Sequence, residues 1–192
     1  MNQYILFTGA PGSKWSSVAH DIRYCPELDR SDASLEREYI SPNSYGPAHH
    51  IGAYWDPGME FGIEREEWDK PFSGTGIRVI KSHTFAHELQ HLVYYNHPIV
   101  LVHRNDVECL EHWKKAGAFD ISYPNYKPYY KDLDAIYRHI VWQNRDIMDF
   151  IHNNARVTRV HSNIELQESL GLTTIGKPEF YKNRDVTVYV YK

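Results

Sequence analysis

The chain has 192 residues, of which 42% are hydrophobic and 24% charged, and its formal net charge is −4. This length suits one domain with a single core, so we expect residues 1–192 to form one domain. The negative balance excludes the overall basic field that attracts nucleic acid, and we expect no nucleic-acid partner. An anionic ligand would have to be held by a local group of donors.

Two further features bear on where the protein works. No run of about 18 apolar residues is present, and the N-terminus lacks the pattern of a signal peptide, so we expect no membrane segment. Cys25 and Cys109 are too few for a disulfide framework and fit a reducing compartment. We therefore expect a cytoplasmic protein.

The first third of the chain contains one clear strand and one helix. Residues 4–8 form an apolar run that ends at Gly9, which predicts a buried strand, and residues 13–24 have helical character. Residues 26–75 carry scattered Pro, Gly, Asn and Ser with weak periodicity. We expect them to form loops and short helices that shape a binding site.

The remaining elements alternate between strands and helices. Strands are predicted at 76–83, 98–104 and 185–191, and an amphipathic helix at 132–152. A helix at 84–95 would start at Thr84 as its N-cap, and one at 106–116 would start at Asn105 or Asp106 and end at Gly117. This order predicts an α/β fold: a P-loop three-layer sandwich with a mostly parallel central sheet.

The segment from Gly9 to Ser17 has the composition of a phosphate-binding loop. Gly9 and Gly12 allow the backbone to turn and to direct its N–H groups toward one point, and Lys14 adds a full charge. The usual nucleotide loop is G-x-x-x-x-G-K-[ST], whereas this chain has no glycine directly before Lys14 and has Trp15 after it. This weakens a nucleotide-kinase interpretation. An ordinary strand-to-helix turn remains an alternative.

Three blocks of the sequence resemble the P-loop sulfotransferase family, specifically its small phage-encoded members. Pro11-Gly12-Ser13-Lys14-Trp15-Ser16-Ser17 is similar to the family's 5′-phosphosulfate loop, although the lysine lies two places later. Lys81-Ser82-His83 is similar to a strand end that reads Lys-Thr-His. Val102-His103-Arg104-Asn105, with the helix that follows, is similar to the 3′-phosphate motif, with Cys109, Leu110 or His112 where the family has serine. Gly176-Lys177 and Lys182-Asn183-Arg184 match the family's late glycine-rich loop only loosely.

The resemblance implies a sulfotransferase that uses 3′-phosphoadenosine 5′-phosphosulfate (PAPS) as co-substrate, with no metal. His83 would be the general base, Lys14 with the loop N–H groups would stabilise charge on the bridging oxygen, and Lys81 would help to hold the sulfuryl or phosphate oxygens. Arg104 would bind the 3′-phosphate, and adenine would stack on an aromatic ring such as that of Trp15. The implied donor-binding residues are Gly9, Pro11, Gly12, Ser13, Lys14, Trp15, Ser16, Ser17, Arg104, Cys109 and His112. The acceptor would be a small molecule, glycan or peptide bound by the 26–75 region and the tyrosine-rich 123–130 stretch, and Glu60 is a second candidate base.

A zinc motif competes with this interpretation. His87-Glu88-Leu89-Gln90-His91 matches H-E-x-x-H, and His97 lies where the longer pattern has a third ligand. Such a site would make the protein a metallopeptidase. Tyr94 stands where that pattern has glycine, and the segment lies between two buried strands, both of which count against it. A nucleotide-binding module without catalysis is a further alternative.

Overall fold

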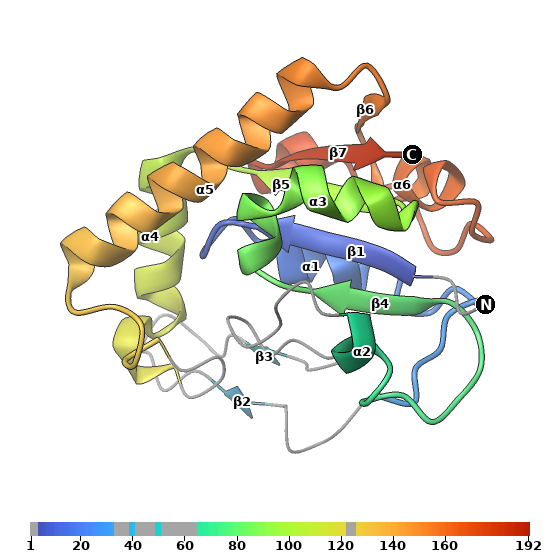
Figure 1. Ribbon diagram of the computed structural model, residues 1–192, viewed down its shortest axis with the longest axis horizontal. Helices are drawn as coiled ribbons and strands as arrows, with labels where there is room; N and C mark the ends of the chain where they lie inside the picture. The colour runs from blue at the N-terminus through green and yellow to red at the C-terminus, as the bar shows by residue number, and fades with distance from the viewer. Residues whose placement is uncertain (1–3, 33–38, 41–48, 51–64, 122–125) are drawn as a thin grey trace.

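The computed structural model of the protein describes residues 4–32, 39–40, 49–50, 65–121 and 126–192. Its main feature is a five-stranded sheet with the strand order β4-β1-β5-β7-β6 (Figure 1). The strands of this sheet are β1 Tyr4–Gly9, β4 Arg78–Lys81, β5 Ile99–His103, β6 Val157–Val160 and β7 Thr187–Tyr191. A separate ladder joins β2 Tyr39–Ile40 to β3 His49–His50.

The sheet is parallel at its centre. β1 pairs in parallel with β4 on one side and with β5 on the other, whereas β7 is antiparallel to both of its neighbours, β5 and β6. Of the five strands, only β7 therefore runs in the opposite direction. The carboxyl ends of β1, β4, β5 and β6 consequently meet at one edge of the sheet.

Helices cover both faces of this sheet. Trp15, Val18 and Ile22 pack on one face together with Leu166 and Tyr181, which follow later in the chain. The opposite face is covered by Phe85, Leu89 and Leu92 and by Ile147 and Phe150 of the long orange helix α5 in Figure 1. The helices are α1 Trp15–His20, α2 Arg65–Trp68, α3 Leu89–Leu92, α4 Asp106–Ala116, α5 Leu133–Asn153 and α6 Asn163–Ser169.

The predicted α/β sandwich with a sheet that is mostly parallel at its centre is confirmed. Several elements lie close to where the sequence predicted them. The predicted strands 4–8, 76–83, 98–104 and 185–191 correspond to β1, β4, β5 and β7. Helix α4 begins after Asn105, whose side chain accepts hydrogen bonds from the backbone of Val107 and Glu108. It ends at Gly117, where a φ of 128° favours glycine.

Two predicted helices are shorter than the sequence suggested. The helix predicted at 13–24 is limited to α1, because Lys14 has a left-handed backbone (φ 64°) and residues 21–24 form turns. The segment 84–95 is not one helix: a 3₁₀ turn, Thr84–His87, is followed by α3 and by a second 3₁₀ turn, Val93–Tyr95. Thr84 is not its N-cap; His83 precedes the first turn and provides no side-chain cap.

Most of the 26–75 region lies outside the described residues, and so does Glu60. No helix in the described ranges is long and apolar enough to cross a bilayer.

Candidate anion-binding site

The chain between β1 and α1 is a tight turn that leaves no room for side chains at its glycines. A Cβ added to Gly12 would lie 1.9 Å from the carbonyl oxygen of Cys109 in α4, and Gly12 has a φ of 79°. A Cβ on Gly9 would lie 2.5 Å from the Ser13 hydroxyl. Both glycines are therefore required by close approach, and the loop is held against the start of α4.

Ser13 lies inside this turn. Its backbone N–H donates to the carbonyl of Ala10 at 2.9 Å, and its side chain is completely buried. The Ser13 hydroxyl has no hydrogen-bond partner among the described residues. Since a buried hydroxyl without a partner costs about 1–3 kcal/mol, the turn contains a polar group that a ligand could satisfy.

Positively charged side chains gather around the turn. Lys14 donates from Nζ to the carbonyl of Arg184 at 2.9 Å. Burial and repulsion from Arg104 lower the pKa of Lys14. The Lys81 ammonium group lies 5.8 Å from the centre of the Trp15 ring, and Lys81 is only 2% exposed. Three cationic side chains thus share one small region of the sheet edge.

Arg104 links the turn to α4. It directs Nη1 toward the carbonyls of Gly12 (3.4 Å) and Glu108 (3.1 Å) and pairs through Nη2 with the Glu108 carboxylate at 2.9 Å. Its Nε atom is buried and has no partner in the described part of the chain. Glu108 is half exposed and is the anionic group paired with this guanidinium. An anionic ligand could replace it.

His83 is the residue most tightly fixed at this edge. Its Nδ1 lies 2.7 Å from the Gly9 carbonyl oxygen, which can only accept, so Nδ1 carries a proton. Nε2 lies 3.1 Å from the hydroxyl of Tyr126 and can accept its proton. His83 is 2% exposed. It therefore reaches any ligand through Tyr126 in the described conformation.

Two buried amides of α5 support the site from behind. Gln143 donates to the His83 carbonyl at 2.6 Å, and Asn144 donates to the Arg104 carbonyl at 2.8 Å and to the Asp106 carboxylate at 2.6 Å. Sequence reasoning missed both residues, together with the role of Tyr126. The signal was present, because Gln143 and Asn144 interrupt the apolar face of an amphipathic helix, where a buried polar side chain needs a partner.

The residues of the turn that were predicted to bind the donor differ in how far they are exposed. Trp15 is 5% exposed, and its ring centre lies 4.6 Å from that of His83 and 5.8 Å from the Lys81 ammonium group. This buried ring is not an exposed surface on which adenine could stack. Ser17 is exposed and its hydroxyl accepts from Arg184 at 3.4 Å. Pro11 is buried within the turn, and Ser16 is partly buried.

Cys109 and His112 project from α4 toward the same region. Cys109 is completely buried, its thiol lies 3.5 Å from the Arg104 carbonyl, and burial raises its pKa to about 12. It is a packing residue. Burial, followed by the charges of Lys14 and Arg104, lowers the pKa of His112 to about 4. His112 is therefore neutral at pH 7, and its pKa depends on the charges of Lys14 and Arg104.

The predicted zinc ligands do not come together. His87 pairs with Asp146 of α5 at 2.7 Å, His91 lies beside Tyr94 and Tyr95, and His97 packs against Tyr4. Glu88 has non-helical backbone angles (φ −118°, ψ 16°), so the motif is not on one continuous helix. No group of three His, Cys, Asp or Glu side chains among the described residues could hold a metal ion.

The late segment 181–185 also reaches this edge. Arg184 forms a double hydrogen bond to Asp21 (2.9 and 2.8 Å) and pairs with Glu179, while its carbonyl accepts from Lys14. Its guanidinium is thus fully used in holding the segment against α1. Gly176 and Lys177 lie farther along the same connection, where Lys177 O accepts from Asn163.

The edge as a whole combines a glycine turn, an unpartnered hydroxyl and three cations at the carboxyl ends of parallel strands. The connections from β1 and β5 leave toward opposite sides of the sheet, which is where open α/β sheets bind ligands. No protein-family model, curated protein or solved structure matches this chain.

Proposed function

We propose that the protein is a sulfotransferase of the P-loop type, which moves a sulfuryl group from PAPS to a hydroxyl or amine acceptor. The observation that carries the proposal is that Arg104 and Lys14 lie together at the glycine turn: Arg104 Nη1 is 3.4 Å from the Gly12 carbonyl, and the charge of Arg104 helps to lower the pKa of Lys14. Such a site favours a ligand with more than one anionic group. The resemblance of the three sequence blocks adds sulfuryl transfer to this anion-binding role.

The reaction is an in-line displacement at sulfur. The bond between sulfur and the bridging oxygen of the donor breaks, the bond to the acceptor oxygen or nitrogen forms, and the acceptor loses a proton. Lys14 and Lys81 would stabilise the charge that develops on the bridging oxygen. Because Nε2 of His83 faces the Tyr126 hydroxyl at 3.1 Å, the acceptor's proton would pass to Tyr126 as Tyr126 passes its own to His83.

Arg104 would bind the second phosphate of the donor. In the described conformation its Nη2 pairs with Glu108, so donor binding would displace a half-exposed carboxylate. Glu108 then competes with the ligand. Because the ligand must displace a carboxylate from Arg104, an anionic ligand should bind and a neutral nucleoside should not.

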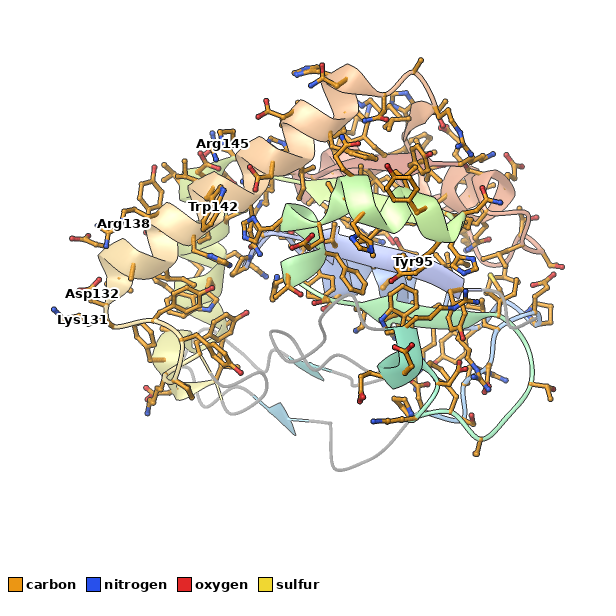
Figure 2. All side chains as sticks on the ribbon, viewed as in Figure 1. Tyr95, Lys131, Asp132, Arg138, Trp142 and Arg145 are labelled. Atoms are coloured by element: carbon orange, nitrogen blue, oxygen red, sulfur yellow. The ribbon has the colours of Figure 1, made fainter. Side chains whose placement is uncertain are left out.

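The test is thermal unfolding with adenosine 3′,5′-bisphosphate, ATP with magnesium, and a chelator in parallel. At about 100 times its dissociation constant, the bisphosphate should stabilise the protein by about 2.7 kcal/mol, which is roughly 5–10 °C in Tm. Lys14→Ala should abolish this shift, whereas Lys131→Ala, at an exposed position just before α5, should keep it. Figure 2 shows Lys131 next to the start of α5.

The other outcomes are equally clear. A shift with ATP and magnesium but none with the bisphosphate would replace the sulfotransferase with a nucleotide kinase. A large loss of stability on chelation alone would indicate a metal site other than one formed by the described residues. His112 provides a direct report, because a bound dianion offsets the charges of Lys14 and Arg104 and should raise its pKa from about 4 in an NMR titration.

A further inference from the structure

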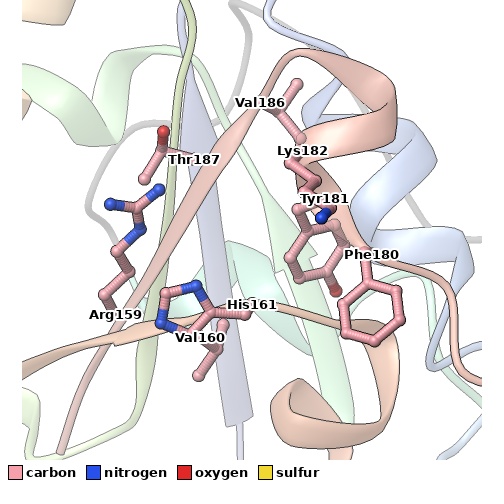
Figure 3. A pocket seen from close by; sticks show the side chains of 8 residues that line it. All are labelled: Arg159, Val160, His161, Phe180, Tyr181, Lys182, Val186 and Thr187. Atoms are coloured by element: carbon pink, nitrogen blue, oxygen red, sulfur yellow. The ribbon is translucent and has the colours of Figure 1, made fainter.

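A pocket opens at the carboxyl end of β6, the outermost strand of the sheet. Its volume is about 180 Å³, and its floor is formed by the buried side chains Val160, Tyr181 and Val186. Figure 3 shows Arg159 on one side of the pocket and Phe180, Tyr181 and Lys182 on the other, with His161 between them. The pocket thus has an apolar base and a rim of basic side chains.

The rim of the pocket carries two basic side chains, Arg159 and Lys182. Within the part of the chain that the structure describes, neither Arg159 nor Lys182 forms an ion pair. The neighbouring carboxylates have other partners: Glu165 accepts from the backbone N–H of His161 at 2.9 Å, and Glu179 pairs with Arg184. Two full positive charges and an imidazole therefore line one concave site, which favours an anion.

Phe180 adds a second kind of contact. Its side chain is 46% exposed, and the Lys182 ammonium group lies 5.8 Å from its ring centre. An exposed aromatic ring beside a cation can stack a ligand ring while the cation binds the ligand's charge. The volume agrees with this size of ligand, since a cavity of about 150 Å³ can hold benzene.

We propose that this pocket is a binding site for a small aromatic ring that carries a phosphate or sulfate group. The ring would rest on Val160 and Val186 against Phe180, and Arg159 and Lys182 would bind the anionic group. These residues are separate from Lys14, Lys81 and Arg104. The binding therefore does not depend on the sulfotransferase proposal.

The pocket lies close to the glycine turn, so one protein could bind a ligand at each of the two sites. Thr187, which also lines it, is paired with His103 at the end of β5, and Arg104 follows directly. On the other side, Lys182 is two residues from Arg184, whose carbonyl accepts the hydrogen bond of Lys14. The pocket and the glycine turn are thus two sites on one edge.

The test is calorimetric titration with phenyl phosphate, inorganic phosphate and benzyl alcohol. Phenyl phosphate should bind with a dissociation constant of about 1 mM or below, and each fragment alone at least about tenfold more weakly. Arg159→Gln and Lys182→Gln should each weaken phenyl phosphate binding about tenfold. Phe180→Ala should weaken phenyl phosphate but leave inorganic phosphate unchanged. Arg138→Gln, an exposed cation on α5, is the matched control and should have no effect (Figure 2).

Two results would overturn the proposal. One is the absence of saturable phenyl phosphate binding to the parent protein. The other is binding that Arg159→Gln and Lys182→Gln leave intact but Lys14→Ala removes, which would assign the ligand to the glycine turn. Because loss of bisphosphate binding depends on Lys14 and loss of phenyl phosphate binding on Arg159 and Lys182, the two proposals fail separately.

Discussion

Lys14 is the residue at which the backbone and the proposed chemistry conflict most directly. It is a non-glycine residue with φ 64° and ψ 19°, at the N-cap position of α1, and its side chain makes no capping hydrogen bond. A left-handed conformation costs about 1–2 kcal/mol for a residue with a Cβ. Glycine would be the better choice for folding alone, so the side chain is retained at a cost to stability.

This conflict gives a prediction at Lys14. Lys14→Gly relieves the backbone strain but loses the hydrogen bond to the Arg184 carbonyl, and each effect amounts to about 1 kcal/mol. Lys14→Ala loses the bond and keeps the strain. We therefore expect Lys14→Gly to match the parent in urea unfolding and Lys14→Ala to be about 1 kcal/mol less stable, while neither binds the bisphosphate. A glycine variant less stable than the alanine variant would show that the position is not strained.

At the scale of elements, α5 connects the two strand ends that carry His83 and Arg104. It starts at Asp132, whose carboxylate accepts from Ala135 N at 2.8 Å, and its buried face carries Gln143 and Asn144 among apolar side chains. These two amides fix the carbonyls of His83 and Arg104, at the ends of two different strands. The helix thus sets the distance between the base and the guanidinium.

Asn144→Leu tests this positioning role. The substitution removes the donor to the Arg104 carbonyl and to Asp106, and leaves buried oxygens without that partner. We expect a loss of about 1–3 kcal/mol in urea unfolding and a weaker bisphosphate affinity, because Arg104 is no longer held. Arg145→Gln, next to it on the exposed side of α5, is the control (Figure 2). Reduced stability with unchanged bisphosphate affinity would make Asn144 a purely structural residue.

The sequence predicted elements best where local signals agree. Helix α4 has a capping asparagine and a terminal glycine, and α5 has a strong apolar period, so both were predicted almost to the residue. The 84–95 segment misled, because its composition is helical throughout but the His83 carbonyl accepts the Gln143 amide and the first turn tightens to 3₁₀ geometry. β6 was missed: it has only four residues, Val157–Val160, two of them exposed, and is too short to show a periodic pattern.

At the scale of the whole molecule, the fold class follows from the alternation of strands and helices, but the site does not follow completely. The glycine turn, Lys81, His83 and Arg104 were located because they end predicted strands. Tyr126 was not, because its contact with His83 joins residues 43 positions apart and Tyr126 belongs to no helix or strand that a periodic pattern would reveal. The direction of β7 was also not predictable, since an alternating strand reads the same either way.

The histidines that the fold keeps neutral predict how stability changes with pH. Burial lowers the pKa of His112 to about 4 and that of His139 to about 3, against an ordinary value of 6.5. Between pH 6.5 and 4 the unfolded chain therefore binds more protons than the folded one, so stability falls as the pH is lowered. We expect Tm to fall by several degrees between pH 7 and about 4.5, and His139→Phe to reduce that slope. A Tm independent of pH across this range would contradict the depressed values.

The place of β7 in the sheet has a consequence for how the protein folds. β7 follows both β5 and β6 in the chain, yet it lies between them and is the strand that joins them. During synthesis, β6 emerges before β7, the described strand that connects it to the sheet. The pocket beside β6 can therefore form only after β7 has been inserted, and the slow, non-local pairing of this last strand should set the folding rate.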